Sequence, residues 1–412
     1  MRVLHLNTWG GIGGAFLAAD RLHQGLLRSG TESVMAYGRT LDDSDAQIRQ
    51  SPHYRALVGY PVEKVITRFT KRIGLNDIGN VSSLRLHQQN DVEQASVLNF
   101  HNLHSDYFSY FALPKLTAEK AAVWTFHDMW AFTGHCAYSN DCRKWQTGCG
   151  SCPYPGELPA IRHDATHWEW KLKHWVYDRS KFTIVAPSRW LAHLAEQSMM
   201  NRFQVHHIPY GIDTDIYRPL DYEICRQELG LPRNKHVILF GAQILKDVRK
   251  GGDLLLKALE HLPSSLKAET ILLTLGSGGK ELAKSVGMET LDLGYVREDE
   301  RKAISFSAAD LFVFPTRADN LPLVLQESIA CGTPMVSFRV GGVPDIVRPG
   351  VTGYLAEPED AIDLSAGIVK LLEDEPLRIQ MRQNCRTIAL EEYTLERQAS
   401  RYLELYQHLL QN

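Results

Sequence analysis

The sequence predicts an α/β protein made of two doubly wound parallel sheets, and three observations carry this prediction. Short apolar, β-rich runs alternate with helical patterns along nearly the whole chain, which is typical of βαβ units. The alternation is interrupted at residues 206–219, where HHIPYGIDTDIYRP holds two prolines and a glycine. At 412 residues the chain is also too long for one compact core. We therefore expect two domains with a boundary near Thr214.

The elements follow one another in a regular order. In the first half, a strand at 2–7 leads through a glycine-rich loop into an amphipathic helix at 15–30. Strands are then expected at 32–38, 96–101, 121–127 and 182–188, and in the second half at 236–242, 269–278, 289–296, 309–316 and 333–340. The last helix, about 395–410, has an apolar stripe that must pack on something. The expected domains are 1–214 and 215–392, followed by a terminal helix at 393–412.

Composition narrows the class of protein. An apolar fraction of 44% and a charged fraction of 23% are ordinary for a soluble globular chain, and a net charge of −3 gives no reason to expect nucleic-acid binding. The N-terminus runs directly into a strand, and we find no apolar run long enough to span a membrane. We expect a cytoplasmic protein. Three single cysteines, Cys225, Cys331 and Cys385, are expected to be reduced and buried.

An acid pair follows the apolar run LFVFPT and says most about function. Asp319 and Glu327 are eight positions apart, which places one carboxylate on a loop and the other about two turns into a helix. Pro322 is expected at the first helical position, and the amides of Leu323 and Val324 then point outward. This arrangement suits a sugar nucleotide, with amides for the diphosphate and acids for hydroxyls. The alternative is a solvated Glu327 and an Asp319 that caps the helix.

Two other loops are candidates for binding phosphate. The loop GGIGGA contains Gly13 and Gly14 and leaves its backbone free to approach an anion. It is not a dinucleotide motif, because the glycine spacing fails at Phe16; a plain tight turn is the alternative. In the second half, Arg249 and Lys250 precede a glycine pair and suit a diphosphate leaving group, unless they are merely solvated.

Further polar residues lie near the expected strand ends. His127 and Asp128 follow the strand at 121–127, where the ligand crevice of a doubly wound sheet lies. His127 could bond a sugar or phosphate, or be satisfied by the backbone, and Asp128 could cap the next turn. Asp213 and Asp215 form an Asp-x-Asp pattern that can hold a divalent cation, but turn chemistry explains it adequately.

Two surface segments complete the candidates. The loop 136–152 holds four cysteines, the ligand count of a structural zinc site, with a packed thiol cluster as the alternative; these are Cys136, Cys142, Cys149 and Cys152. Residues 60–75 form a basic amphipathic stretch that could lie on an anionic membrane. More often such a segment is a surface helix with its apolar face on the core.

The motifs GGIGGA, FHDMW, RKGGD, LGSGG and RADNLPLVLQESIACGTPMV, in this order, resemble the retaining glycosyltransferases of family 4. The cysteine loop resembles the branch that builds bacterial exopolysaccharides, including colanic acid. The resemblance implies the GT-B fold, with two Rossmann-like domains facing across a cleft and a final helix that crosses back to the first domain. It also implies metal-independent transfer of a hexose from a UDP- or GDP-sugar to a growing polysaccharide or oligosaccharide, expected to be lipid-linked. The inner membrane face is a candidate location.

The resemblance also assigns roles to residues. Those near the reacting centre are His127, Arg249, Lys250 and Asp319, and those that contact the donor are Gly13, Gly14, Val296, Asp319, Asn320, Leu321, Pro322, Leu323 and Glu327. Two positions depart from the family pattern. Asp319 stands where glutamate is usual, and Gly241-Ala242 replaces the usual Gly-Arg, so Arg249 is the candidate for the missing cation. The alternatives are a sugar-nucleotide epimerase or hydrolase, or a noncatalytic sugar-binding partner in a biosynthetic complex.

Overall fold

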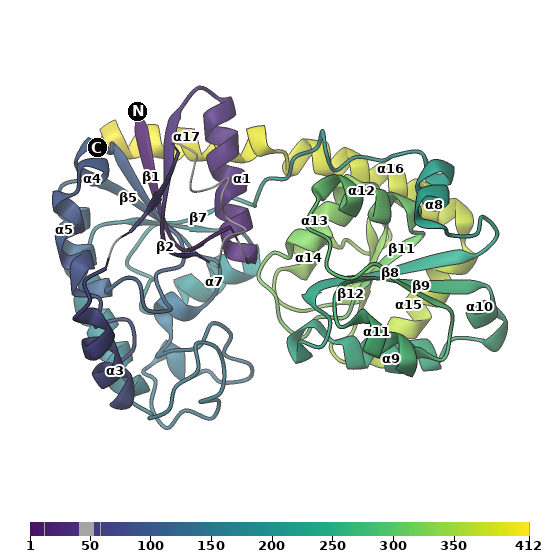
Figure 1. Cartoon of the computed structure of the whole chain (residues 1–412), viewed down its shortest axis with the longest axis horizontal. Helices are drawn as coiled ribbons and strands as arrows, with labels where there is room; N and C mark the ends of the chain where they lie inside the picture. Colours follow the sequence, from purple (N-terminus) through teal and green to yellow (C-terminus); the bar gives the residue numbers. More distant parts are fainter. Residues whose placement is uncertain (12, 41–52, 58, 412) are drawn as a thin grey trace. The chain divides into compact units, whose positions relative to one another are not determined.

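The computed structural model describes residues 1–11, 13–40, 53–57 and 59–411, which fall into two compact units (Figure 1). The first unit comprises Met1–Gly211 and Leu395–Asn412, and the second comprises Ile212–Thr394. The units thus divide at Gly211, slightly before the boundary expected at Thr214, and the terminal helix starts at Leu395 and not at 393.

The first unit contains a seven-stranded sheet in which every pair is parallel, with the order β3-β2-β1-β4-β5-β6-β7. The strand order reverses between β1 and β4, and ligands of doubly wound sheets bind beyond the carboxyl ends of the strands at such a point. The strands are β1 Arg2–Gly10, β2 Glu32–Thr40, β3 Tyr54–Ala56, β4 Val97–Phe100, β5 Ala121–Thr125, β6 Thr183–Ala186 and β7 Val205–His207.

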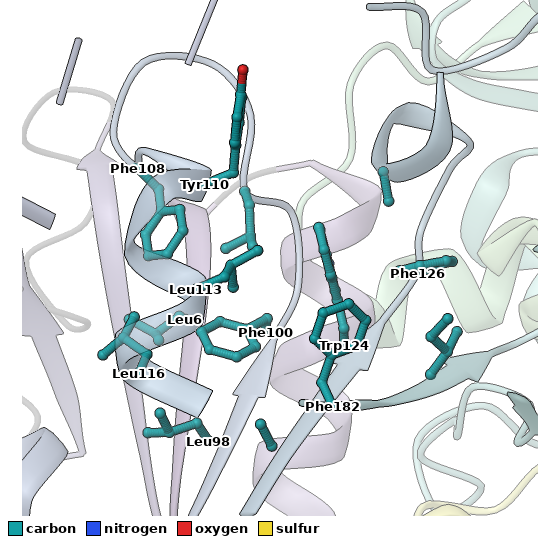
Figure 2. Close-up of a cluster of buried hydrophobic side chains, with 14 of the residues drawn as sticks. Leu6, Leu98, Phe100, Phe108, Tyr110, Leu113, Leu116, Trp124, Phe126 and Phe182 are labelled. Carbon is teal, nitrogen blue, oxygen red and sulfur yellow. The ribbon is translucent and has the colours of Figure 1, made fainter. Parts of the chain in front are cut away.

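Helices cover this sheet and complete its core. They are α1 Gly14–Arg28, α3 Glu63–Arg72, α4 Asn90–Gln94, α5 Leu113–Ala118, α6 Thr166–Tyr177, α7 Arg189–Glu196 and α17 Leu395–Gln411, with 3₁₀ turns at Val81–Gln88, Tyr110–Ala112, Trp130–Phe132 and Lys144–Gln146. Figure 2 shows Phe100 and Trp124 on neighbouring strands, with Leu113 and Leu116 of α5 among the side chains of the same buried cluster. These strands are buried on both faces because helices cover both faces.

The terminal helix α17 packs on the first sheet beside α1 (Figure 1), which accounts for its apolar stripe. The Tyr406 hydroxyl accepts a hydrogen bond from Asn99 Nδ2 at 2.8 Å, and the Tyr402 hydroxyl lies 2.9 Å from Thr125 Oγ1. Gly25 lets α1 approach closely, since a Cβ there would come within 2.9 Å of the Leu395 carbonyl oxygen.

The second unit contains a six-stranded parallel sheet with the order β10-β9-β8-β11-β12-β13, and its strand order reverses between β8 and β11. The strands are β8 His236–Ile244, β9 Thr270–Ser277, β10 Thr290–Asp292, β11 Leu311–Phe314, β12 Met335–Phe338 and β13 Gly353–Ala356. The helices are α8 Tyr222–Leu229, α9 Gly252–Glu260, α10 Ser264–Ala268, α11 Gly279–Val286, α12 Asp299–Ala308, α13 Leu323–Ala330, α14 Val343–Ile346, α15 Ala361–Glu373 and α16 Glu375–Glu392, with a 3₁₀ turn at Val248–Lys250.

The two predicted parallel sheets are therefore confirmed, with some differences in extent. The sequence did not predict β3 or β7, whose three residues are exposed or half-buried, or β13, which begins with a glycine. Strand β10 ends at Asp292, whereas we expected it to run to Val296. No helix in the part of the chain that the structure describes is long and apolar enough to cross a membrane.

Candidate functional site

In the second unit, the acid pair flanks the start of helix α13. The helix begins at Leu323 with Pro322 as its N-cap residue, so Pro322 is not the first helical residue that we expected. Glu327 is the fifth residue of α13, a little over one turn into the helix and not two. Its side chain is buried, with 5% of its surface exposed. It is therefore not the solvated helix residue of the alternative interpretation.

Asp319 binds both cations of the preceding loop. Its Oδ2 accepts a hydrogen bond from Lys250 Nζ at 2.6 Å and one from Thr316 Oγ1 at 3.2 Å, while its Oδ1 lies 3.2 Å from Arg249 Nη1. Arg249 Nη1 also donates to the Ala318 carbonyl at 2.9 Å. Asp319 is therefore not the helix cap of the alternative interpretation. The structure joins Arg249, Lys250 and Asp319 in one cluster, which we call the Asp319 cluster.

The cations of the Asp319 cluster stabilise the charged form of the Asp319 carboxylate. Burial alone would raise the pKa of the Asp319 carboxyl, but Lys250 and Arg249 outweigh it and hold that pKa below its ordinary value. Burial lowers the pKa of Lys250, and the attraction of Asp319 opposes this shift. Arg249 has a second acidic neighbour, since Asp247 Oδ2 lies 3.6 Å from its Nη2. The two cations are thus fixed in place before any ligand arrives, which is the preorganisation that stabilises developing negative charge.

Glycines bring three loops together around Asp319. Gly251, with φ 72°, allows the loop after β8 to approach the loop after β11, since a Cβ there would lie 1.8 Å from the Pro315 carbonyl oxygen. Gly341, with φ 51°, does the same for the loop after β12, because a Cβ there would lie 2.0 Å from the Asp319 carbonyl oxygen. Gly342 N donates to that same oxygen at 3.1 Å. We did not predict Gly341 and Gly342, although a glycine pair directly after a predicted strand was a usable signal.

The remaining candidates of the second unit lie near this edge of the sheet. Asn320 and Leu321 are each 3% exposed and connect Asp319 to the helix start. Val296 is buried in the loop between β10 and α12. Asp213 Oδ1 accepts hydrogen bonds from the amides of Asp215 and Ile216 at 3.0 and 3.3 Å, which is the turn chemistry that we held as the alternative to a cation site.

In the first unit, the glycine loop leads into the N-terminus of α1. Gly13 has φ 84° and is the N-cap residue, and α1 begins at Gly14. A Cβ at either position would meet no described atom within 4 Å, so the backbone is open here. Ile12, between Gly11 and Gly13, lies outside the described residues. An open helix N-terminus of this kind can accept an anionic group.

His127 lies beyond the carboxyl end of β5, and both of its ring nitrogens have partners within the unit. Nε2 is 2.9 Å from His101 Nδ1, and Nδ1 is 2.6 Å from the Tyr210 hydroxyl. Burial lowers the pKa of His127 to about 4, so the ring is neutral at neutral pH. The neighbouring Asp128 accepts from the Trp130 amide at 2.8 Å, as its capping interpretation predicted, and from His104 Nε2 at 3.3 Å. We did not predict a role for Tyr210, whose hydroxyl reaches His127 from beyond β7.

The four loop cysteines are free and half-buried. Cys149 Sγ accepts a hydrogen bond from the Gly134 amide at 3.2 Å, and Cys152 Sγ lies 3.2 Å from His135 Nε2. Burial raises the pKa of Cys136 to about 12 and that of Cys149 to about 11, so these thiols keep their protons. Within the described ranges, no group of three or more His, Cys, Asp or Glu side chains is arranged to hold a metal ion. The structural zinc stays a prediction from the sequence.

Comparison with known families matches both halves of the chain. Residues 12–216 match the family described as Glycosyltransferase Family 4, and residues 221–388 match the family described as Glycosyl transferases group 1. The colanic acid biosynthesis glycosyl transferase WcaC of Escherichia coli (strain K12) is 26% identical over 380 residues, which cover 87% of this chain and 88% of that protein. D-inositol 3-phosphate glycosyltransferase 1 of Catenulispora acidiphila is 34% identical over 191 residues, 43% of this chain and 45% of that protein.

Solved structures agree with this assignment at the level of the fold. Sucrose-phosphate synthase from Thermosynechococcus elongatus superposes with a TM-score of 0.72 at 19% identity, covering 99% of both chains. Anabaena Alr3699/HepE in complex with UDP-glucose superposes with a TM-score of 0.70 at 18% identity, covering 99% of this chain and 100% of that one. The two Rossmann-like units thus define a glycosyltransferase of the GT-B fold. Within that class, the chain belongs to the family 4 type.

Proposed function

We propose that the protein moves a hexose from a nucleotide diphosphate sugar to a growing polysaccharide or oligosaccharide, with retention of the anomeric configuration and without a catalytic metal ion. The observation that carries this proposal is the Asp319 cluster, where two cations are fixed beside the start of α13. The name of WcaC, a protein of colanic acid biosynthesis, supports a polysaccharide acceptor, and the UDP-glucose bound to Alr3699/HepE supports a UDP-sugar donor.

Different residues of the second unit would bind different parts of the donor. Lys250 and Arg249 would bind the diphosphate together with backbone amides at the helix start, to which Pro322 contributes no N–H. Glu327 would bind the ribose hydroxyls and Asp319 the hexose. Asp319 is one methylene shorter than glutamate, and the ion pairs with both cations already use its two oxygens. A hydroxyl of the hexose would therefore bind an acid that is held in a fixed position.

The reaction would occur on one face of the hexose. The bond between the anomeric carbon and the diphosphate oxygen breaks, and the acceptor oxygen forms its bond to that carbon. A phosphate oxygen of the departing diphosphate takes the proton of the acceptor hydroxyl. Lys250 and Arg249 stabilise the charge that grows on the diphosphate, which is where preorganised cations contribute most.

A transfer assay tests this function. Pure protein is incubated with radiolabelled UDP- or GDP-hexoses and a membrane glycolipid extract, and label is expected to enter the glycolipid fraction. The same incubation without acceptor separates the alternatives, because an epimerase or hydrolase forms product there and a transferase does not. Binding of a sugar nucleotide with no turnover under any condition would instead identify a noncatalytic binding partner.

We also propose that the first unit touches an anionic membrane surface through α3, in line with a lipid-linked acceptor. This helix is turned with its polar side inward: Glu63 and Thr70 are buried, whereas Val65 and Phe69 are 69% and 65% exposed. The apolar side therefore does not pack on the core, and the more usual arrangement that we considered for this segment is wrong.

Basic residues border this outward face. Lys64, Arg68 and Arg72 form no ion pair with any described residue, and Lys71 pairs with Asp106. Apolar side chains flanked by cations suit the boundary between lipid headgroups and acyl chains. The protein should sediment with vesicles of phosphatidylcholine and phosphatidylglycerol, and the V65S/F69S variant should not. Ile362→Ser, a change at a residue 65% exposed in the second unit, is the matched control. Equal sedimentation of all three proteins would contradict the proposal.

A further inference from the structure

Three histidine rings form a row across adjacent strands of the first sheet. His5 lies in β1, His101 directly follows β4, and His127 follows β5. His5 Nδ1 is 3.0 Å from His101 Nε2, and His101 Nδ1 is 2.9 Å from His127 Nε2. Both pairs have ring centroids 5.2 Å apart and planes inclined by 28°. The row is therefore regular, with each ring presenting Nδ1 to Nε2 of the next.

The row ends at Tyr210 on one side and at an unpartnered nitrogen on the other. His127 Nδ1 is 2.6 Å from the Tyr210 hydroxyl, and their rings stack with centroids 5.5 Å apart. At the inner end, His5 Nε2 is buried and has no hydrogen-bond partner among the described residues. His23 of α1 approaches His5 edge-on with ring centroids 6.0 Å apart, but its own Nδ1 bonds Ser33 Oγ at 2.7 Å.

All three rings are neutral at neutral pH. Burial lowers the pKa of His127 to about 4 and holds the pKa values of His5 and His101 well below the ordinary value. A neutral imidazole has one N–H and one lone pair. His101 bonds a neighbour on each side, so it must donate to one and accept from the other. Every hydrogen bond of the row then points the same way, and the tautomer of one ring fixes the tautomers of the other two.

We propose that His5 and His101 are positioning residues that fix the ring orientation and the tautomer of His127, and through it the direction of the hydrogen bond with Tyr210. This places a defined donor or acceptor at the carboxyl edge of the first sheet, beside the switch point between β1 and β4. The proposal rests on the proposed function only for its effect on activity. The tautomers themselves can be observed without any assay of sugar transfer.

The primary test is nitrogen NMR of the full chain labelled with ¹⁵N-histidine. We expect the rings of His5, His101 and His127 to carry their proton on the same nitrogen, either Nδ1 in all three or Nε2 in all three. In His5→Phe, which changes a ring that does not touch His127, the His127 signals should become those of a tautomer mixture. In His23→Phe, a matched change at an equally buried ring outside the row, the His127 signals should stay as in the wild type.

Activity provides an independent readout. His101→Phe should lower kcat by about tenfold to a hundredfold at saturating donor, since a misplacement of about 1 Å near the reacting atoms can cost about a hundredfold. His101→Gln, whose amide can donate on one side and accept on the other, should recover most of that loss. Different tautomers within the wild-type row, or an unchanged His127 in folded His5→Phe, would overturn the proposal. If wild-type protein transfers no sugar, the proposed function fails, and the NMR comparison still decides the role of the row.

Discussion

Lys250 Nζ lies 2.6 Å from Asp319 Oδ2, so the cation assigned to the leaving group is paired with the acid assigned to the donor sugar. Their side chains are only 18% and 12% exposed. Removing Asp319 would take from the buried Lys250 its acidic partner, and removing Lys250 would leave Asp319 with Arg249 alone. Substitutions in this cluster therefore need a stability measurement beside each kinetic one.

The Glu327→Ala variant should weaken donor binding more than it slows turnover. A carboxylate on the ribose would contribute equally to the ground state and the transition state, so its loss raises KM and leaves kcat nearly unchanged. We expect a rise of about tenfold in the KM for the donor, the effect of a lost hydrogen bond to a charged group. Glu228→Ala, on the exposed side of α8, is the control. A variant that lost kcat at unchanged KM would remove Glu327 from its assigned role.

Gly251→Ala should destabilise the second unit strongly. The added Cβ would lie 1.8 Å from the Pro315 carbonyl oxygen, so the loop that carries Lys250 must move. Gly230 has nearly the same φ, 70°, but a Cβ there would meet no described atom within 4 Å. In urea unfolding, Gly230→Ala should lower the free energy of unfolding by about 1 to 2 kcal/mol, the strain of a left-handed alanine. Gly251→Ala should lower it clearly more. Equal losses would show that the close approach at Pro315 is unimportant.

Buried histidines should make the first unit less stable in mild acid. Burial lowers the pKa of His23 to about 4, whereas in the unfolded chain it is about 6.5. Below pH 6.5 the unfolded state binds the proton and the folded state does not, so stability falls as the pH drops from 6.5 towards 4.

The comparison with His23→Phe isolates this effect. Wild-type protein should lose about 2 kcal/mol more unfolding free energy than His23→Phe between pH 7 and pH 5. The His163→Phe variant, which changes an exposed histidine, should show the same dependence of unfolding free energy on pH as the wild type. If the free energy of unfolding depended on pH in the same way for wild type and His23→Phe, His23 would take up its proton as readily in the folded protein as in the unfolded chain.

The cysteine loop offers a test of the sequence-derived zinc site. If the four thiols bind zinc, elemental analysis of protein purified under reducing conditions should give about one zinc per chain, and a chelator should loosen the loop. In the present geometry Cys149 bonds the Gly134 amide and Cys152 contacts His135. Zinc binding therefore predicts that these sulfur contacts are exchanged for metal ligation. Metal-free protein with four titratable thiols and full transfer activity would leave a plain thiol cluster.

The sequence predicted short strands such as β4 and β11 because every residue in them is buried, and it missed β3 and β7 because their three side chains are exposed or half-buried. It also missed β13, which begins with a glycine. It also placed Asp319 and the two cations of the second unit in loops that prove to be neighbours. It could not predict the pairing of Lys250 with Asp319, because they are 69 positions apart and meet only once β8 and β11 are adjacent. The bond between His127 and Tyr210 likewise depends on the order of β5, β6 and β7. Spacing along the chain contains no information about such contacts.

The turnover of Lys250→Ala at saturating donor tests the central claim most directly. If Lys250 stabilises charge that appears only as the diphosphate leaves, kcat should fall by about a hundredfold, as for other preorganised groups that act on developing charge. Lys246→Ala, on the exposed part of the same loop, should keep the wild-type kcat. Both proteins are first shown to be folded by their melting temperatures. A folded Lys250→Ala protein that transfers hexose at the wild-type rate under saturating donor would contradict the role given to the Asp319 cluster.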